Sequence, residues 1–452
     1  MPGPYVAPMR ADEKLPEKVD IVVIGGGIVG ASTALELSEM GLSVALCDKG
    51  GVGQEQSGRN WGWVRLSRRD IREMPLMLEA TKLWSNMAER TGTDVGYRKT
   101  GIVFTTSSRA QQDLYKKYHD ELSAFGVHSK LLSAAEVKAA YPDLDLPLSG
   151  ALVTPDDGRA EPQLATVAIA QTAQRKGANI LVECAVRGLE LAAGKVSGVV
   201  TERGTIRCSS VVLAAGVWSN FFARRYGIDI PQLNVMASVL RTNPIEGGPE
   251  QAIWCKDFAL RKRLDGGYTI ASGHENVVHL VPRSFKYLVD FLPALKSDWH
   301  SLNFRPSLRF FKDIRDAGLK PLDEPSAFEY TRTLDPVPYK RLADGALDAL
   351  GKVWPVFRGA TIAQRWGGYI DILPDAVPII DKAEKIPGLC IATGFSGHGF
   401  GIGPAAGKLM AEIVAGKTTC VDARNFRLAR FSDGTKTVLS PDLRPGDIQQ
   451  PA

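Results

Sequence analysis

Short apolar runs that end in glycine alternate along this chain with longer amphipathic stretches. The run from Val19 to Ile24 is rich in β-branched residues and is followed at once by glycine, which is typical of a buried parallel strand. Residues 158–190 read as an amphipathic helix that ends in glycine before another strand, and residues 388–416 repeat the order strand, glycine-rich turn, helix. Between them, a hairpin pattern over 194–216 also ends in glycine. The pattern predicts an α/β fold in which three distant segments build one domain.

The first of these turns carries a dinucleotide-binding pattern. Gly25 allows a tight turn, Gly27 allows a pyrophosphate to approach the backbone, and Gly30 allows the following helix to pack on the strand. The pyrophosphate would then lie at the positive end of that helix. A second strand ends at Asp48, 18 residues beyond Gly30, close to the spacing at which an acidic residue reaches a ribose hydroxyl. Because the motif stands between a strand and a helix, we interpret it as a ligand site and not as a bare glycine loop.

The remaining segments differ in character and suggest a second domain. They contain strand-like runs and hairpin signals such as Asp265-Gly266-Gly267, which favour an antiparallel sheet. We therefore expect a three-layer Rossmann-type domain and an antiparallel-sheet substrate domain with a helical insert. The dinucleotide domain is predicted to comprise residues 18–95, 151–225 and 373–433, the substrate domain residues 96–150 and 226–372, and two polar, proline-rich extensions residues 1–17 and 434–452.

The insert in the substrate domain, residues 283–315, is rich in aromatic side chains and carries more Lys and Arg than Asp. A packed helical hairpin is the expected structure. A surface that meets a membrane or a partner is the alternative, which we do not favour from the sequence.

Composition excludes several function classes. A net charge of +5 over 452 residues is too small to argue for nucleic acid binding. The six cysteines are scattered, with no CxxC pair and no metal-ligand spacing, so we expect free thiols, a reducing compartment and no metal site. The chain shows neither a leader-like N-terminus nor 18 consecutive apolar residues, and we expect a soluble cytoplasmic protein.

Several motifs together resemble one family. They are GGGIVG at 25–30, SGRNWGWVR at 57–65, DGRAEPQLATVAIAQTAQRKGA at 157–178, VVLAAGVWS at 211–219, and PIIDKAEKIPGLCIATGFSGHGFGIGPAAG at 378–407. In this order they resemble the FAD-dependent amine and amino-acid oxidoreductases of the D-amino-acid oxidase superfamily, which includes sarcosine oxidase, glycine oxidase and D-amino-acid dehydrogenase. The resemblance implies an FAD domain and a substrate domain whose sheet covers the flavin.

The resemblance also implies which residues hold FAD. Asp48 would bind the adenosine ribose, Val186 would offer backbone hydrogen bonds to adenine, and Gly216 would let a strand end pass the pyrophosphate. The helix after Gly397 would point its N-terminus at the flavin and stabilise negative charge there. The full predicted cofactor set is Gly25, Gly27, Ile28, Val29, Gly30, Asp48, Lys49, Ser57, Arg59, Asn60, Trp61, Val186, Ala215, Gly216, Trp218, Gly368, Gly397, His398, Gly399, Phe400 and Gly401.

Candidate substrate contacts follow from matched positions. Arg65 lies near the place where sarcosine oxidases keep an arginine for the substrate carboxylate, and His274 matches an active-site histidine of those enzymes. A surface salt bridge is the alternative for Arg65, and a structural role is the alternative for His274. Tyr330, Arg332 and Tyr369 are weaker candidates for the pocket wall.

Departures from the family pattern refine the expectation. The cysteine that binds flavin covalently in sarcosine oxidase falls at Gly368, so FAD is expected to be noncovalent. Two carboxylate anchors of relatives fall at Gly401 and near Ile370, which argues against a simple small amino acid. The lysine that promotes reaction with oxygen falls near Ile270, and its loss favours a dehydrogenase over a fast oxidase.

These observations predict an enzyme that oxidises the C–N bond of an amino acid or secondary amine bearing an acidic group. Hydride would pass to flavin N5, and water would hydrolyse the resulting imine. Electrons would go to a quinone, a dye-like carrier or oxygen. Two alternatives stay open: a 2-hydroxy-acid dehydrogenase on the same fold, and a noncatalytic flavin-binding assembly protein.

Overall fold

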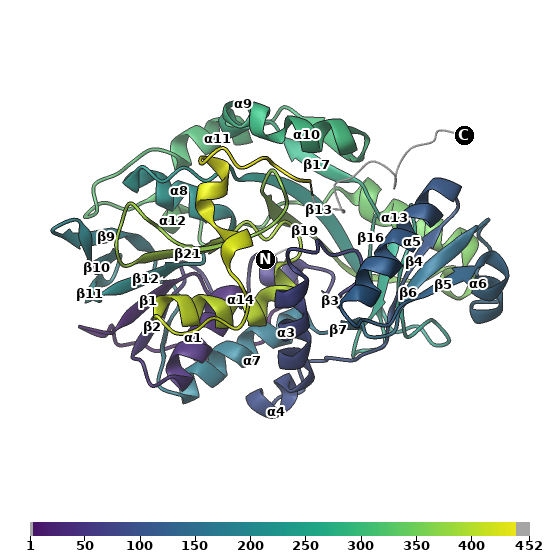
Figure 1. Ribbon diagram of the computed structural model, residues 1–452, viewed down its shortest axis with the longest axis horizontal. Helices are drawn as coiled ribbons and strands as arrows, with labels where there is room; N and C mark the ends of the chain where they lie inside the picture. The colour runs from purple at the N-terminus through teal and green to yellow at the C-terminus, as the bar shows by residue number, and fades with distance from the viewer. Residues whose placement is uncertain (1–2, 440–452) are drawn as a thin grey trace.

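The computed structural model describes residues 3–439, except for the side chain of residue 298, and it has two sheet-based halves (Figure 1). The predicted extension 1–17 is described from residue 3 and docks on the body, where Ala7 N–H donates to Gln163 O and Asp12 N–H to Ile180 O. Residues 440–452 of the predicted C-terminal extension lie outside the described residues.

The first half is built on a six-stranded sheet in the order β20–β21–β12–β1–β2–β8, parallel except for β20. The register pairs Ile21 with Val44 on one side and with Ser210 on the other, so segments far apart in sequence lie side by side. This is the segmental assembly expected from the sequence. The strands are β1 (Ile21–Ile24), β2 (Val44–Cys47), β8 (Asn179–Leu181), β12 (Ser210–Leu213), β20 (Ile379–Lys382) and β21 (Leu389–Thr393).

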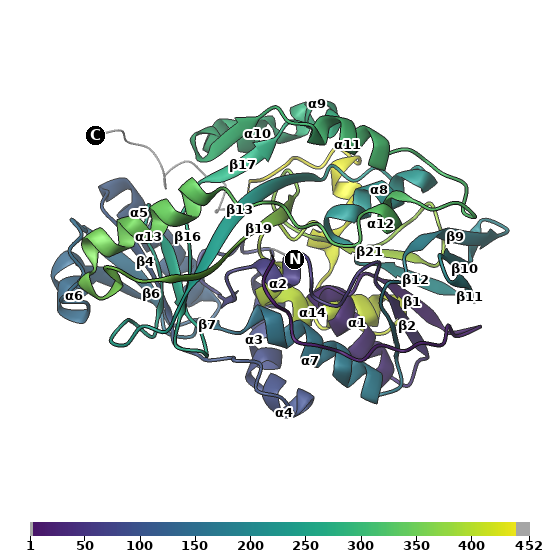
Figure 2. The same ribbon diagram turned by 180° about the vertical axis from the view of Figure 1, so that it is seen from behind.

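Both faces of this sheet are covered, which explains why its strands are almost continuously apolar. Ile21 and Val23 pack against helices, whereas Val22 and Ile24 pack against a three-stranded antiparallel sheet on the opposite face. The result is three layers, seen from both sides in Figures 1 and 2. The helices are α1 (Ile28–Glu39), α3 (Met74–Ser85), α7 (Pro162–Arg175) and α14 (Gly399–Val414), with the short α2 (Gln56–Arg59), α4 (Met87–Thr91) and α8 (Ser219–Ala223); the opposite layer is β9 (Val186–Ala192), β10 (Lys195–Thr201) and β11 (Gly204–Arg207).

The second half is a ten-stranded, mainly antiparallel sheet. Residues 151–154 belong to its strand β6, although the sequence-based boundary placed them in the dinucleotide domain. The long strand β13 pairs with β16, β17 and β19. The strands are β4 (Ile102–Thr106), β5 (Lys130–Ser133), β6 (Gly150–Thr154), β13 (Leu233–Thr242), β14 (Ala252–Trp254), β15 (Ala259–Lys262), β16 (Tyr268–Ala271), β17 (Asn276–His279), β18 (Leu302–Arg305) and β19 (Ile362–Ile372), and a two-stranded ribbon joins β3 (Trp63–Val64) to β7 (Gly158–Arg159).

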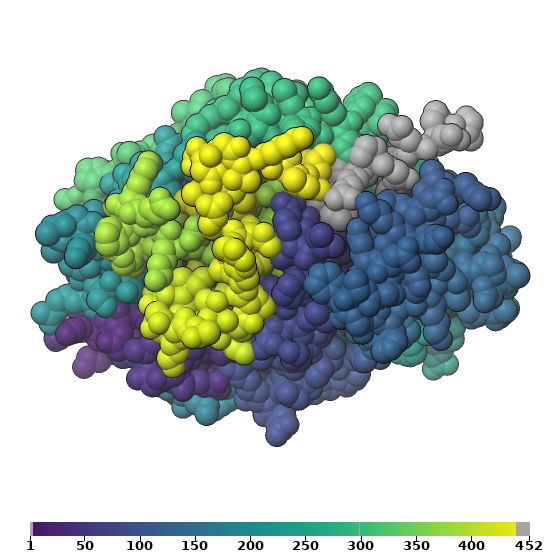
Figure 3. Space-filling model, in the orientation of Figure 1, coloured from purple at the N-terminus to yellow at the C-terminus, as the bar shows by residue number. Residues whose placement is uncertain are grey.

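The helices of the second half flank this sheet. The insert is not the expected helical hairpin, because β18 interrupts it and pairs in parallel with β17. Figure 3 shows the insert as part of the outer surface at the upper edge of the molecule. The helices are α5 (Arg109–Ala124), α6 (Ala134–Ala140), α9 (Pro282–Lys286), α10 (Leu288–Asp298), α11 (Arg309–Asp316), α12 (Ala327–Tyr330) and α13 (Lys340–Val353).

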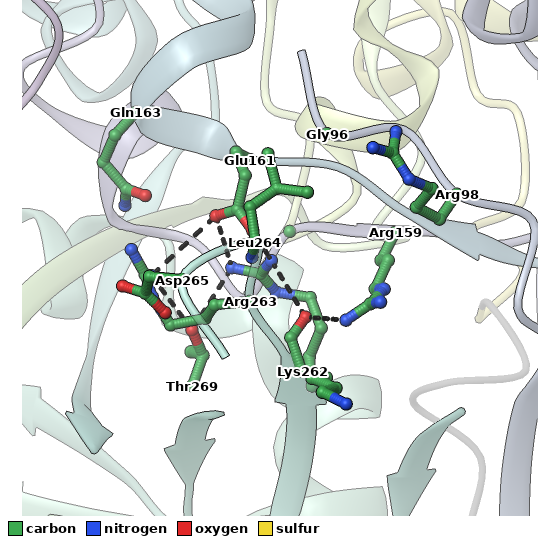
Figure 4. Close-up of polar contacts among 12 residues, drawn as sticks. Gly96, Arg98, Arg159, Glu161, Gln163, Lys262, Arg263, Leu264, Asp265 and Thr269 are labelled. Atoms are coloured by element: carbon green, nitrogen blue, oxygen red, sulfur yellow. Dashed lines mark hydrogen bonds and ion pairs between the residues drawn. The ribbon is translucent and has the colours of Figure 1, made fainter. Parts of the chain in front are cut away.

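A buried polar cluster connects the two halves (Figure 4). Glu161 lies just before α7 in the first half, and its carboxylate accepts hydrogen bonds from Arg261 of β15 and from Leu264 N–H. Arg263 lies 3.9 Å from the same carboxylate and contacts Asp265. Because Glu161 carries charge in a buried position, the two arginines are needed to offset its loss of hydration.

Candidate active site

A cavity of about 690 Å³ lies between the two halves, within the size range of ligand and cofactor sites. One wall comes from the glycine turns of the first half, including Gly25, Gly216 and Gly397. The opposite wall comes from strands β13, β17 and β19 of the second half. The sheet of the second half therefore covers the glycine-rich edge of the first.

The start of α1 opens into this cavity. Gly25 has a φ of +109°, and a Cβ there would clash with the carbonyl oxygen of Ala214. Gly27 is the N-cap residue and offers no side chain to the N–H groups of the first turn, although Ser57 Oγ accepts from Ile28 N–H at 2.9 Å. The remaining N–H groups and the helix dipole suit an anionic ligand such as a pyrophosphate.

Asp48, at the end of β2, holds the turn in place. Its Oδ2 accepts from Gly26 N–H at 2.6 Å and its Oδ1 from Gly50 N–H at 2.7 Å. Burial raises the pKa of this carboxyl, while Lys49 and the two N–H donors act in the opposite direction. A carboxylate accepts about four hydrogen bonds, so Asp48 keeps capacity for ribose hydroxyls.

The start of α14 also faces the cavity. His398 is its N-cap residue, Gly397 has a φ of +85°, and both line the cavity with Gly399. His398 Nδ1 lies 3.2 Å from Glu73 Oε2, and both side chains are buried. Two helix N-termini whose own N-cap residues make no capping hydrogen bond thus meet one cavity, an arrangement that fits a long dinucleotide with phosphates and an electron-accepting ring.

The structure brings together most of the predicted cofactor set. Gly30 packs beneath the turn, where a Cβ would clash with Gly25 O, and Gly401 packs beside Trp63 O and the Arg69 guanidinium. These two positions shape the site without lining it. The members of the predicted set that line the cavity are Gly25, Gly27, Ile28, Val29, Asp48, Lys49, Ser57, Arg59, Asn60, Trp61, Val186, Ala215, Gly216, Trp218, Gly368, Gly397, His398, Gly399 and Phe400.

Gly368 of β19 lies where the two walls approach each other. A Cβ at this position would lie 3.2 Å from Arg59 Cβ, and Arg59 itself donates to Gly367 O and Asp335. Nearby, the buried Asp371 accepts from Gln56, Gln232 and Gly394 N–H, so one carboxylate joins three segments. Burial raises the pKa of Asp371 despite these donors. The covering strand is therefore fixed to the dinucleotide half by polar contacts.

The five predicted substrate residues fall in different places. Arg65 and His274 line the cavity, whereas Tyr330 is exposed on the surface and does not. Arg332 borders the cavity but is paired with Glu202 and donates to Lys49 O, close to Asp48. Tyr369, next to Gly368 on β19, also lines the cavity; the Arg309 guanidinium lies 4.3 Å from its ring, and the side chain packs in the cluster that contains Met236.

Sequence reasoning missed a wall of arginine and aromatic side chains beside Arg65. The Arg68 guanidinium lies over the rings of Phe104 and Trp254 at 5.1 and 5.2 Å, and Arg65 lies 5.9 Å from Phe104. Arg68 has a φ of +52°, a conformation that costs a non-glycine residue about 1 to 2 kcal/mol. The basic run directly after NWGW was the signal that could have revealed this wall.

Asp157 holds the loop that carries these arginines. Its carboxylate accepts from Leu66 N–H at 2.5 Å, from Ser67 N–H and from the Ser67 hydroxyl. Burial raises the pKa of Asp157 to about 6, although the three hydrogen bonds oppose that shift. The loop is thus held by a carboxyl group that ionises near neutral pH.

Comparison with known proteins identifies the class. Residues 20–413 match the family described as FAD dependent oxidoreductase. Human mitochondrial sarcosine dehydrogenase is 25% identical over 95% of this chain and 43% of its own length, and sarcosine oxidase subunit beta of Rhizobium meliloti is 26% identical over 92% and 89%. The structure of L-amino acid deaminase from Proteus myxofaciens in complex with anthranilate has a TM-score of 0.91 and 31% identity, with 95% and 97% of the two chains covered.

The chain therefore belongs to the FAD dependent oxidoreductase family, and the expected fold and FAD cofactor are confirmed. It spans less than half the length of the mammalian relatives that it matches. Among residues 3–439, no helix is long and apolar enough to cross a membrane.

Proposed function

We propose that this protein is a dehydrogenase that oxidises the C–N bond of an amino acid or secondary amine bearing an acidic group. The observation that carries the proposal is one cavity that joins the dinucleotide cradle to a wall of arginine and aromatic side chains. The similar proteins support it, since all three are named for amino acids and sarcosine carries a methyl group on its nitrogen.

We assign the loop 65–69 to binding of the acidic group of the substrate. Arg65 Nη1 donates to Ser67 O at 2.6 Å and to Arg68 O at 3.0 Å, which fixes the guanidinium at the cavity wall. A fixed guanidinium binds a carboxylate with less loss of side-chain freedom than a mobile one. Trp254 and Phe104 exclude water from the same region, which strengthens the charge interaction.

We assign to His274 the role of accepting a proton from the substrate nitrogen. Its Nδ1 lies 2.6 Å from Lys256 O, and because a carbonyl only accepts, Nδ1 carries the proton of the neutral ring. Nε2 then has the lone pair and can take a proton from a substrate ammonium group. Bound FAD supplies the chemistry of hydride acceptance.

Two features favour slow reaction with oxygen and a noncovalent cofactor. Ile270, near which the resemblance to sarcosine oxidase places the oxygen-activating lysine, is buried in β16 and brings no charge to the site. Gly368 offers no thiol to the flavin. On this basis, we propose that a quinone or a dye-like carrier accepts the electrons of the reduced flavin.

A dye-coupled assay of Arg65→Ala tests the proposal. With N-methylated and unmodified amino acids, we expect KM to rise by about tenfold or more, because a guanidinium–carboxylate contact contributes roughly 1.5 to 3 kcal/mol. Arg98→Ala removes an exposed arginine paired with Asp94 and serves as the control. An unchanged KM in Arg65→Ala would show that Arg65 does not bind the acidic group of the substrate.

A further inference from the structure

The helix α11 in the insert is oriented with its apolar side outward. Leu308, directly before it, is 83% exposed, and Phe311 and Ile314 are 67% and 51% exposed. On the inward side, Asp313 and Asp316 are each only 9% exposed, and Asp313 is paired with Arg283 at 2.8 Å. A surface helix of a soluble domain normally packs its apolar face on the core and exposes its polar face. The outward side of α11 is therefore apolar and exposed, which suits it to contact with another apolar surface.

Exposed apolar side chains of α10 extend this apolar face. Val289, Leu292 and Trp299 are exposed and follow one another at spacings of three and seven residues, which places them along one side of α10 and the turn after it. Phe285 of α9 is also exposed, but it borders the cavity. Figures 1 and 2 show α9, α10 and α11 along one edge of the molecule. We call this face the outer insert surface; it consists of Val289, Leu292, Trp299, Leu308, Phe311 and Ile314.

The outer insert surface is set in an excess of positive charge. Residues 282–320 contain eight Lys and Arg against four Asp, a net charge of +4, compared with +5 for the whole chain. Lys296 and Arg305 are both exposed within this segment. Exposed Phe, Leu and Trp side chains beside Lys and Arg form the composition that binds the interface of an anionic bilayer.

We propose that the outer insert surface docks on membranes that contain anionic lipids. A second copy of the chain is a poorer occupant, because a two-fold interface would place two segments of net charge +4 against each other. An anionic lipid surface instead offers opposite charge to the basic residues and an apolar layer to Phe311 and Trp299. The inward side of the same segment, including Phe291 and Leu295, lines the cavity, so docking brings the cavity close to the lipid surface.

Vesicle co-sedimentation of the full chain tests the proposal without any substrate. We expect the protein to sediment with vesicles of phosphatidylcholine and phosphatidylserine, and to remain in solution with phosphatidylcholine alone. High salt should weaken the association because it screens the headgroup charge. Two variants should bind about tenfold more weakly or worse: Leu308→Ser with Phe311→Ser, and Lys296→Glu with Arg305→Glu.

Matched controls come from the far end of the large sheet. Leu131→Ser in β5 and Lys117→Glu in α5 change exposed residues of the same types away from the insert. These variants should bind vesicles as the parent protein does. Bound FAD and the unfolding temperature, measured for all variants, show whether each is folded.

Three results would overturn the proposal. They are no sedimentation with either vesicle, equal binding by the outer-surface variants and their controls, and a dimer formed without lipid that Leu308→Ser with Phe311→Ser abolishes. Activity with a soluble dye is measured in parallel. Retained dye activity with lost vesicle binding assigns the surface to docking alone, so this test succeeds or fails independently of the proposed reaction.

Discussion

Arg261 Nη1 lies 2.7 Å from Glu161 Oε1, and the two side chains are only 1% and 6% exposed. Arg261 belongs to β15 of the large sheet, whereas Glu161 precedes α7 of the dinucleotide half. Attraction by Arg261 and Arg263 lowers the pKa of Glu161 despite its burial. The pair thus connects the two halves of the molecule through a charge contact that is almost fully buried.

Breaking this pair should destabilise the protein strongly. Glu161→Gln leaves the Arg261 charge buried without its counter-ion, and we expect the free energy of unfolding to fall by about 3 to 5 kcal/mol. Denaturant titration measures the change. The control is Asp94→Asn, which breaks the exposed pair with Arg98 and should cost less than about 1 kcal/mol. Equal losses in the two variants would show that the buried pair has no special role.

The loop with Arg65 and Arg68 should make stability depend on pH through Asp157. Its pKa is about 6 in the folded protein against 3.8 ordinarily, so the folded state binds the proton more tightly. The stabilising contribution is full below 3.8 and is lost as the pH rises through 6. Between pH 5 and pH 7, we expect about 1 kcal/mol of unfolding free energy to disappear from this group.

Asp157→Asn isolates this effect, because an amide does not titrate. Its unfolding free energy should change less between the two pH values than that of the parent protein. The same pH difference in both proteins would mean that another group is responsible.

Asp48 should contribute directly to FAD retention. Asp48→Ala removes the acceptor of two backbone N–H groups and the proposed ribose contact, and we expect affinity to fall by about 1 to 3 kcal/mol. Titration of the apoprotein with FAD, followed by flavin fluorescence, gives the dissociation constant. Asp113→Ala, at an exposed position in α5, is the control. Unchanged FAD affinity in Asp48→Ala would refute the ribose role.

The flavin should leave the protein on denaturation. Since residue 368 is glycine, acid precipitation should release all of the FAD into the supernatant. The flavin absorbance of the supernatant and of the redissolved precipitate shows which fraction contains the FAD. Flavin that stays with the precipitated protein would reveal a covalent bond at another residue.

The dinucleotide half could be predicted from sequence because its signals are local. The turn at Gly25–Gly30, Asp48 and the strand end at Gly216 each follow from glycine and charge at short spacings, and all reach the cavity. The surroundings of Tyr369 could not be predicted in the same way, because the Arg309 guanidinium over its ring comes from the insert, 60 residues earlier in the chain.

Long-range pairs explain the other differences. The inward side of α11 is polar because Asp313 pairs with Arg283, 30 residues earlier, and periodicity alone suggests the reverse orientation. Arg68 reaches the cavity because its backbone adopts a positive φ and its side chain stacks on Phe104 and Trp254, which lie far apart in the sequence on the paired strands β4 and β14. No local pattern contains that information.

Anaerobic reduction of the bound flavin tests the central claim most directly. The purified yellow protein is mixed, without oxygen, with D-amino acids, L-amino acids, N-alkylated amino acids and matched 2-hydroxy acids. We predict that an amine with an acidic group bleaches the oxidised flavin band, and that the hydroxy acid of the same carbon skeleton does not. Bleaching by hydroxy acids alone, or by no compound of either class, would contradict the assignment of C–N oxidation to this site.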